Sequence, residues 1–278
     1  MKAKLLLTGA TGFIGSQIYN TLKNDFEVIA ISSSSKNQNF TVVNLLDEDA
    51  CKDFFYDKKF DFVIHAAAIA HGKNHFNNMS VGEANILMTN NIFNSLDIKE
   101  TSVIYLSSVS VYSFKNNKEV ISVQDKPIPV TEYGDSKLAC EKIIKDKGPK
   151  SLHILRLAPV YSEANLHDLG KRVFLPVFKV PFATKQERMY SLCNINEAVK
   201  TVLKSLKSDE DSLIIVKDSK DYTQHDLLLF FNLEKPKIII NRNLIKPLLF
   251  ALSLIPLSKA NVIRDMFAKL FYSVRYTN

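Results

Sequence analysis

The chain is poor in the residues that build metal sites and disulfide frameworks, with only Cys51, Cys140 and Cys193 among 278 residues. These cysteines lie far apart and match no metal-binding spacing, so we expect buried thiols in a reducing compartment. His71 and His75 stand four residues apart, as two ligands on a helix would, but no third ligand lies nearby and no glutamate follows the first histidine. We therefore expect no metal site.

Two further features are missing. No block rich in lysine and arginine with interleaved aromatic residues occurs, so we expect no nucleic-acid partner despite the net charge of +7. No apolar run is long enough to cross a bilayer: residues 244–257 hold Lys246 and two prolines, which predicts a core helix pair without membrane contact. Peripheral membrane contact is the lesser alternative for this segment. A strand pattern begins at residue 4, so we expect no signal peptide and a cytoplasmic protein.

Strand and helix patterns alternate along the chain. Such alternation predicts an α/β fold, a Rossmann-type doubly wound parallel sheet with a small, interleaved C-terminal substrate domain. The expected strands cover residues 4–7, 27–31, 40–43, 61–65, 102–107, 152–157 and 213–217, and the expected helices cover residues 16–22, 81–96, 133–147 and 195–206.

The first strand leads into the motif Thr-Gly-Ala-Thr-Gly-Phe-Ile-Gly, residues 8–15. Gly9, Gly12 and Gly15 allow a tight turn, close approach of the backbone to a pyrophosphate, and close packing of helix on strand. The start of the following helix offers free N–H groups and a positive dipole end to phosphates. A strand before the motif and a helix after it therefore predict a dinucleotide site.

A second motif is Tyr133-Gly-Asp-Ser-Lys137. Residues four apart share a helix face, and an ammonium near a phenol lowers the phenol pKa, so Tyr133 suits proton transfer near neutral pH. Ser108 follows the apolar strand 102–107, and a hydroxyl at that end of a central parallel strand lies at the mouth of the ligand crevice.

In this order the motifs resemble the extended short-chain dehydrogenase/reductase family, the NAD-dependent epimerase/dehydratase group that modifies nucleotide sugars. The resemblance runs from Lys4 to about Lys217. It rests on the glycine motif, on Tyr133 and Lys137, and on a set of flanking segments: His65-Ala66-Ala67-Ala68, Asn85 with Thr89, Ser107 to Tyr112, Arg156 to Tyr161, and Asn194 to Ala198. Met88 and Asn194 depart from the family pattern, which has glycine and aspartate there.

The resemblance implies catalytic roles for Ser108, Tyr133 and Lys137. Tyr133 would be the acid/base on a sugar hydroxyl or keto oxygen, Lys137 would hold the ribose and tune Tyr133, and Ser108 would hydrogen-bond the same oxygen. It also implies a cofactor-binding set of Gly9, Thr11, Gly12, Phe13, Ile14, Gly15, Ser32, Ser33, Lys36, Asn44, Leu45, His65, Ala66, Ala67, Ala68, Asn85, Ser107, Tyr133, Lys137 and Pro159. The cofactor would exchange a hydride with the sugar carbon.

Three departures narrow the expected activity. Dehydratases of the family carry an acidic pair after the catalytic hydroxyl, whereas this chain has Val109 and Ser110, which disfavours dehydration. Ser32 replaces the acidic residue that binds the ribose 2′-hydroxyl of NAD, and Lys36 follows, so NADP(H) is slightly favoured over NAD(H). Asn44 replaces an adenine-contacting aspartate, and its amide can still bond adenine.

The implied substrate is a nucleotide-diphosphate sugar, in the synthesis of surface-polysaccharide sugars. Arginine suits a diphosphate, so Arg172 and Arg188 are candidate substrate residues, with Lys171 and Lys179 as further cations and Ser108 and Ser110 on the sugar side. Epimerase and 4-ketoreductase both fit, and a non-catalytic dinucleotide-binding sensor or scaffold is the alternative from another class.

The resemblance also implies how the chain is divided into domains and how it assembles. Residues 1–160 with about 190–218 would form the dinucleotide-binding domain, and about 161–189 with 219–278 the small substrate-binding region. A homodimer is expected, paired through the helices at 81–96 and 133–147.

Overall fold

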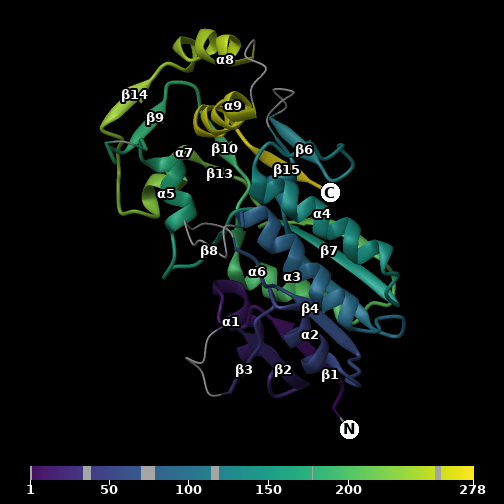
Figure 1. Cartoon of the computed structure of the whole chain (residues 1–278). Coiled ribbons are helices and arrows are strands. Elements are labelled where there is room, and N and C mark those ends of the chain that lie inside the picture. Colours follow the sequence, from purple (N-terminus) through teal and green to yellow (C-terminus); the bar gives the residue numbers. More distant parts are fainter. Residues whose placement is uncertain (1, 34–38, 70–78, 114–118, 177, 254–257) are drawn as a thin grey trace. The chain divides into compact units, whose positions relative to one another are not determined.

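The computed structural model describes residues 2–33, 39–69, 79–113, 119–176, 178–253 and 258–278. Its main feature is a seven-stranded sheet in the order β12-β7-β5-β4-β1-β2-β3 (Figure 1). The strands are β1 (Lys4–Thr8), β2 (Glu27–Ser32), β3 (Thr41–Val42), β4 (Phe62–His65), β5 (Ser102–Ser108), β7 (Ser151–Leu157) and β12 (Ser212–Val216). The pairs from β5 across to β3 run parallel, which confirms the predicted doubly wound α/β fold.

The strand order explains where a ligand site can form. β1 pairs with β2 on one side and β4 on the other, so the direction of the crossovers reverses between β1 and β4. A reversal of this kind leaves a crevice beyond the carboxyl ends of the two strands. The glycine motif follows β1 and the Ala66–Ala68 segment follows β4, which brings both predicted segments to this crevice.

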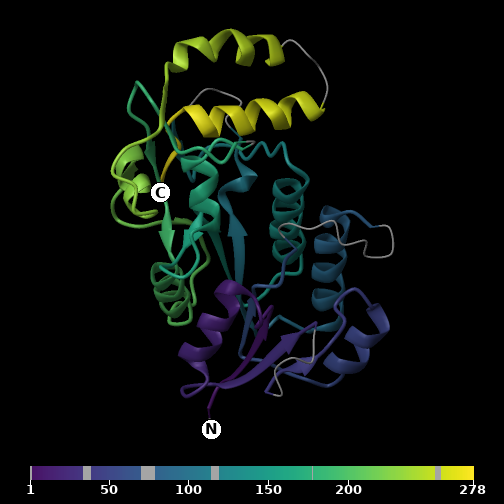
Figure 2. The ribbon, with the colours of Figure 1, turned by 90° about the vertical axis from the view of Figure 1, so that its left-hand side faces the viewer.

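Helices cover both faces of this sheet (Figure 2). α2 (Glu48–Phe55), α3 (Val81–Ser95) and α4 (Glu132–Asp146) lie on one side, while α1 (Phe13–Leu22) and α6 (Ile195–Ser205) lie on the other. Coverage of both faces requires apolar side chains on both faces of the strands, and Leu5, Leu6 and Leu7 in β1 are all fully buried. α3 begins at a capping box in which the Ser80 hydroxyl accepts from the Glu83 N–H and the Glu83 carboxylate accepts from the Ser80 N–H.

The chain divides into two compact units. Unit 1 consists of Met1–Ser108, Glu132–Arg156 and Ala198–Ile214, and it contains most of the sheet with its helices. Unit 2 consists of Val109–Thr131, Leu157–Glu197 and Ile215–Asn278.

Unit 2 is built from short elements joined in pairs. Its two-stranded sheets pair β6 (Val120–Ser122) with β15 (Arg275–Thr277), β8 (Val160–Tyr161) with β11 (Cys193–Asn194), β9 (Phe182–Thr184) with β14 (Ile238–Ile240), and β10 (Met189–Tyr190) with β13 (Tyr222–Thr223). Its helices are α5 (His167–Val173), α7 (Gln224–Leu229), α8 (Lys246–Ser253) and α9 (Ser258–Phe271), with 3-10 turns at Val109–Val111 and Arg242–Leu244. Phe182, Leu270 and Phe271 pack together as a small core.

The segment 244–257 corrects one prediction. Its described part forms α8, but the Leu244 and Phe250 side chains are exposed, so the expected core helix pair is wrong for these residues; residues 254–257 lie outside the described chain. In the described ranges no helix is both long and apolar enough to cross a bilayer. All three cysteines are buried free thiols, which confirms the expected burial.

Candidate functional site

The glycine turn after β1 is shaped by two close approaches. Gly9 has φ +70°, and a Cβ on it would lie 2.6 Å from the backbone nitrogen of Ala67, so the turn rests directly on the chain that leaves β4. A Cβ on Gly15 would lie 2.1 Å from the Gly9 carbonyl oxygen. These contacts leave no room for larger residues, and they fix the start of α1 at the switch point of the sheet.

The N-terminus of α1 fits a phosphate group. Its N-cap is the exposed Gly12, which has no side chain to cap the helix. The first N–H groups of an uncapped helix need a partner, and the helix dipole favours an anion there. Thr11, Gly12 and Phe13 are exposed at this turn, whereas Ile14 and Gly15 are covered in part or fully. The Gly12 N–H already donates to the Gly9 carbonyl at 2.9 Å, so the exposed Phe13 is where the helix backbone can meet a pyrophosphate.

A buried histidine links this turn to α3. His65 is 1% exposed, and its Nδ1 lies 2.8 Å from the Thr8 hydroxyl while its Nε2 lies 3.1 Å from the Thr89 hydroxyl. Thr8 also accepts from the Ala67 N–H, and Thr89 donates to the Asn85 carbonyl. Each hydroxyl has a single proton, so Thr8 donates to Nδ1 and Nε2 carries the ring proton. Burial lowers the pKa of His65 to about 3, which keeps the ring neutral.

Asn85 fixes the chain beyond Ala68. Its side-chain amide accepts from the Ile69 N–H at 2.8 Å and donates to the Ile69 carbonyl at 3.0 Å, a two-point clamp on one peptide. The same amide lies 3.3 Å from the Ser136 hydroxyl in α4. Ala66 and Ala67 are half-buried and Ala68 is exposed, so this fixed segment presents small residues at the crevice. His65 and Asn85 thus fix the position of the glycine turn and of the chain that follows β4.

The predicted catalytic residues lie on β5 and α4. Ser108 ends β5, and Tyr133 lies in the first turn of α4, one helical turn before Lys137. Glu132 anchors that first turn, because its carboxylate accepts from the Gly82 N–H at 2.9 Å. Tyr133 and Ser108 are half-buried, as groups that meet a substrate must be, whereas Lys137 is buried.

Lys137 is held by backbone and by aromatic rings. Its ammonium donates to the Leu106 carbonyl at 2.7 Å and lies 4.8 Å from the ring centre of Tyr105 and 5.8 Å from that of Tyr133. Burial lowers the pKa of Lys137 to about 8 and raises the pKa of Tyr105 well above its ordinary value. Tyr105 is inaccessible and keeps its proton, whereas Tyr133 is half-buried.

Behind Lys137 lies an ion pair that the sequence analysis did not single out. The Glu141 carboxylate accepts from Arg156 Nε at 3.0 Å, from Arg156 Nη2 at 2.7 Å and from the Ser107 hydroxyl at 2.5 Å, and all three side chains are buried. A bidentate pair with a third hydrogen bond satisfies the buried charges. The sequence could have indicated Glu141 by its spacing, because Tyr133, Lys137 and Glu141 follow one another at intervals of four residues and share one face of α4. Ser107 therefore has a bonding partner within the protein.

The end of β2 carries the residues that bear on cofactor choice. Ser32 is buried, with its hydroxyl 3.4 Å from that of Thr11 in the glycine turn, and Ser33 is exposed. Lys36 lies outside the described residues. After β3, Asn44 is exposed, with its side-chain oxygen accepting from the Leu46 N–H, and Leu45 is buried.

The remaining predicted residues lie in unit 2. Ser110 sits in the 3-10 turn and Pro159 precedes β8, where its carbonyl accepts from the Cys193 N–H. Arg188 is 0% exposed: Nε donates to Gln224, Nη1 donates to the Leu270 carbonyl, and Nη2 has no hydrogen-bond partner among the described residues. Burial lowers its pKa. Arg172 donates to the Asp168 carbonyl and lies over the Tyr190 ring.

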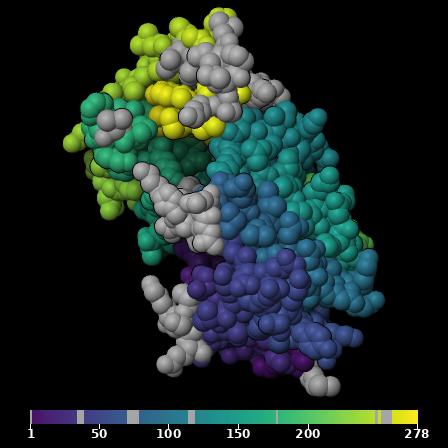
Figure 3. Space-filling model, viewed as in Figure 1, coloured from purple at the N-terminus to yellow at the C-terminus, as the bar shows by residue number. Residues whose placement is uncertain are grey.

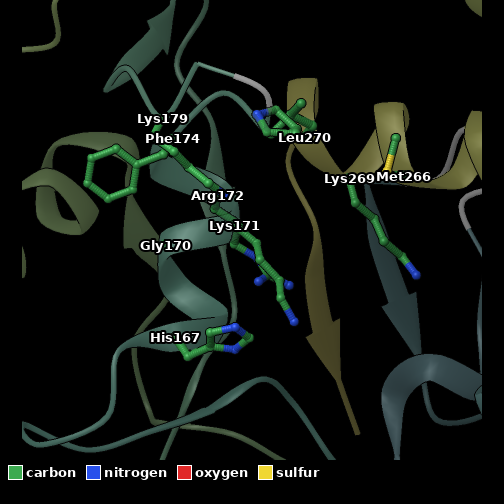
Figure 4. Close-up of a pocket in the computed structure, with 10 residues that line it drawn as sticks. His167, Gly170, Lys171, Arg172, Phe174, Lys179, Met266, Lys269 and Leu270 are labelled. Carbon is green, nitrogen blue, oxygen red and sulfur yellow. The ribbon is translucent and has the colours of Figure 1, made fainter. Parts of the chain in front are cut away.

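Unit 2 also contains a pocket of about 460 Å³ (Figure 4). It is lined by cationic and apolar groups from α5, α9 and the segment after α5: His167, Gly170, Lys171, Arg172, Phe174, Pro176, Lys179, Met266, Lys269 and Leu270. Two of the cations are paired, Lys171 with Asp168 and Lys269 with Asp265. Arg188 does not line this pocket, although it bonds to the carbonyl of Leu270, which does.

No group of three potential metal ligands gathers among the residues that the structure describes. The candidate pair His71 and His75 lies in residues 70–78, outside that part of the chain. Its spacing stays a sequence observation.

Comparisons with known proteins agree with this geometry. The sequence model of the NAD dependent epimerase/dehydratase family matches residues 5–189. The chain is 27% identical over 190 residues to methionine adenosyltransferase 2 subunit beta of Bos taurus, covering 67% of this chain and 55% of that protein. It is 26% identical over 199 residues to GDP-6-deoxy-D-talose 4-dehydrogenase of Aggregatibacter actinomycetemcomitans, covering 69% and 63%. The chain thus matches little more than half the length of these curated relatives.

Among solved structures, the fold is similar to that of dTDP-4-dehydrorhamnose reductase from Bacillus anthracis in complex with NADP, with a TM-score of 0.65, 16% identity, and coverage of 89% of this chain and 93% of that one. At this identity the likeness concerns the fold. The family match covers two thirds of the chain and includes the glycine turn, Ser108, Tyr133 and Lys137. The chain belongs to the NAD dependent epimerase/dehydratase family.

Proposed function

We propose that this protein is an NAD(P)-dependent nucleotide-sugar epimerase or 4-ketoreductase in which Tyr133 is the acid/base at a sugar carbinol or keto oxygen. One observation carries the proposal: the buried Lys137 ammonium, held by the Leu106 carbonyl, lies 5.8 Å from the ring centre of the accessible Tyr133. A fixed positive charge beside a phenol favours its ionised form, which suits the phenol to proton transfer.

The other groups follow from this arrangement. With its pKa lowered to about 8, Lys137 still carries its charge at neutral pH, so it can stabilise the Tyr133 phenolate there. Ser108, at the end of β5, is the hydroxyl we assign to the same substrate oxygen. In the oxidative direction Tyr133 takes the proton of the sugar hydroxyl, and in the reductive direction it returns a proton to the oxygen.

The dinucleotide would be held by the glycine turn and by the segments that support it. Gly9, Gly12 and Gly15 shape the turn, the N-terminus of α1 meets the pyrophosphate, and Ala66 to Ala68 form a small-residue wall. When bound, NAD(P) supplies the hydride acceptor or donor at the sugar carbon. Ser32, Ser33, Asn44 and Leu45 are assigned to its adenosine end.

We favour NADP(H) over NAD(H) slightly. The family name refers to NAD, while the reductase of similar fold from Bacillus anthracis was solved with NADP. Ser32 ends β2 and Ser33 follows it, so neither residue carries a carboxylate that would repel a 2′-phosphate. The dissociation constants of NADPH and NADH, measured by fluorescence titration, test this preference.

The substrate we propose is a nucleotide-diphosphate sugar used to make surface polysaccharide. Arg172 and Arg188 are the candidate diphosphate groups, and Ser110 is a candidate on the sugar side. Nη2 of Arg188 has no partner in the described part of the chain, which favours an anion near it, because a buried donor gains most from a charged acceptor. We further propose a cytoplasmic homodimer, paired through α3 and α4, with cofactor and substrate regions at the boundaries predicted above.

The reaction type follows from what stands after Ser108. Val109 and Ser110 supply no acid and base for eliminating water, which disfavours a dehydratase. Epimerisation and ketone reduction both need only Tyr133, Lys137 and Ser108. The serines after β2 favour the reductase, because such a reductase consumes free NADPH.

A second candidate function rests on a different observation. Sequence relatives include a subunit of methionine adenosyltransferase, so a dinucleotide-binding subunit without activity of its own is the alternative. The intact Ser108, Tyr133 and Lys137 set favours an enzyme over this alternative.

One experiment separates these readings. Purified protein is mixed with UDP-, GDP- and dTDP-sugars, including their 4-keto forms. Net NADPH oxidation identifies a ketoreductase, and equilibration of C4 epimers without added cofactor identifies an epimerase. If the protein binds NADPH but turns over no member of the panel, the dinucleotide-binding subunit becomes the better account.

A further inference from the structure

Two helices of unit 2, α8 and α9, precede the last strand β15 and lie side by side (Figures 1 and 2). We call α8, α9 and the preceding Leu244 the terminal helix pair. Large apolar side chains face solvent on both helices: Leu244 is 73% exposed and Phe250 67%, and Val262, Ile263 and Met266 on α9 are also exposed. Residues of both helices contribute to the molecular surface in Figure 3.

The apolar residues of α9 cover a broad arc of the helix, and the rest of unit 2 buries only part of that arc. Ala268, Leu270 and Phe271 are buried against the rest of unit 2. Val262, Ile263 and Met266 form the exposed part of this arc, which adjoins the buried Leu270 on the same face. A surface helix normally buries its apolar face and exposes polar residues, so this exposed strip needs a partner of its own.

The C-terminal sequence that contains this strip is rich in positive charge. From residue 235 to residue 278 the sequence has eight lysines and arginines and a single acidic residue, Asp265. Asp265 is buried and already paired with Lys269 at 2.6 Å. Met266 also lines the pocket described above, where Lys179 and Arg172 add positive charge beside the strip. Positive charge and exposed apolar side chains therefore occur together.

We propose that the terminal helix pair binds peripherally to membranes that contain anionic phospholipid. Apolar side chains would enter the boundary between headgroups and acyl chains, while the surrounding lysines and arginines would meet lipid phosphates. Each cation near an anionic surface strengthens binding by about fivefold, so several of them add substantially to the apolar contribution. A second copy of the chain is the less suitable occupant, because pairing two such surfaces would bring like charges together. This inference does not depend on the proposed catalytic activity.

The test is sedimentation of the full chain with vesicles at moderate salt. Vesicles of phosphatidylcholine with a quarter phosphatidylglycerol should pellet the protein, whereas pure phosphatidylcholine vesicles should pellet at least fivefold less. The double variant Phe250→Ser/Ile263→Ser should lower the fraction bound at least fivefold. Tyr56→Ser in unit 1, at a side chain that is 82% exposed, is the matched control and should bind like the original protein.

Thermal melting of each variant shows that it is folded, and light scattering gives its mass in solution. Equal pelleting by both vesicle types, or equal binding of the double variant and the original chain, would overturn the proposal. So would a dimer that the double variant dissociates while no form of the protein pellets, because the helix pair would then be an interface between copies.

Discussion

The ammonium of Lys137 donates a 2.7 Å hydrogen bond to the backbone carbonyl of Leu106, two residues before Ser108 on the same strand. This bond joins α4 to β5 and holds a buried charge beside the Tyr133 ring. Burial of the ammonium is unfavourable, and it lowers the pKa of Lys137 to about 8. The site therefore keeps this charge at a cost in stability.

Because burial lowers this pKa, the free energy of unfolding should depend on pH. The pKa of Lys137 is about 8 when folded and about 10.4 for a free lysine, so between these pH values the unfolded chain binds more protons. Stability must then rise with pH across this window, by about 3 kcal/mol at most from this one group. Lys137→Met lacks the group, so the difference in unfolding free energy between variant and original chain should change from pH 7.5 to pH 10 in urea titrations. A difference independent of pH would contradict the burial of a charged Lys137.

His65 should make the stability of the protein depend on pH in the acidic range. Its pKa is lowered to about 3 by burial, so between about pH 6.5 and 3 the unfolded chain again binds more protons, and stability falls as the solution is acidified through that range. His65→Gln should cost about 1–3 kcal/mol at pH 7, because Thr8 and Thr89 lose a partner, and it should remove this acid dependence. Urea titrations at pH 7 and 5 measure both effects. His167→Gln, at an exposed histidine, is the control, and equal behaviour of the two variants would refute the account.

Gly9 and Gly148 form a matched pair, since both have positive φ. A Cβ on Gly9 would lie 2.6 Å from the Ala67 backbone, whereas one on Gly148 would meet only the flexible Lys99 side chain at 3.4 Å. Gly148→Ala should cost about 1 kcal/mol for the backbone conformation alone. Gly9→Ala should cost more and should weaken NADPH binding at least tenfold, measured by fluorescence titration. Similar NADPH affinities of the two variants would mean that the turn after β1 does not form the cofactor cradle.

Most strands of the sheet and its long helices could be predicted from hydrophobic pattern to within one or two residues, whereas α1 begins three residues earlier than expected. A strand expected at 102–107 is observed at Ser102–Ser108, and a helix expected at 133–147 is observed at Glu132–Asp146. Buried parallel strands are continuous apolar runs, and long helices repeat every four residues, so both leave clear patterns. α2 was missed because it is only eight residues long, although the Asp47 cap and the acidic first turn marked its start.

The parts of the site that are close together in the sequence could be predicted from the spacing of their residues. Tyr133 and Lys137 share a helix face by their separation, and the glycine motif follows its strand directly. The partner of Glu141 was not predictable, because Arg156 belongs to a strand that reaches it only through the fold. The exposure of Leu244 and Phe250 was not predictable either, because an apolar sequence does not show whether its side chains lie in the core or at the surface.

The buried pair of Glu141 and Arg156 predicts a large stability effect. Glu141→Gln leaves the Arg156 guanidinium without its carboxylate in a buried site, which should cost about 3–5 kcal/mol in the free energy of unfolding. The control is Asp209→Asn, which breaks an exposed 2.8 Å pair with Lys150 and should cost about 0–1 kcal/mol. Urea titration of both variants makes the comparison, and equal losses would show that burial does not govern the pair.

The central claim is that Tyr133 moves the proton at the substrate oxygen, and Tyr133→Phe tests it most directly once a substrate from the nucleotide-sugar panel has been found. The ring remains and only the phenolic hydroxyl is lost, so NADPH affinity should stay within about threefold of the original. We predict that kcat/KM falls by about a hundredfold or more, the effect of removing a general acid/base. A kcat/KM within about threefold of the original protein would contradict the account.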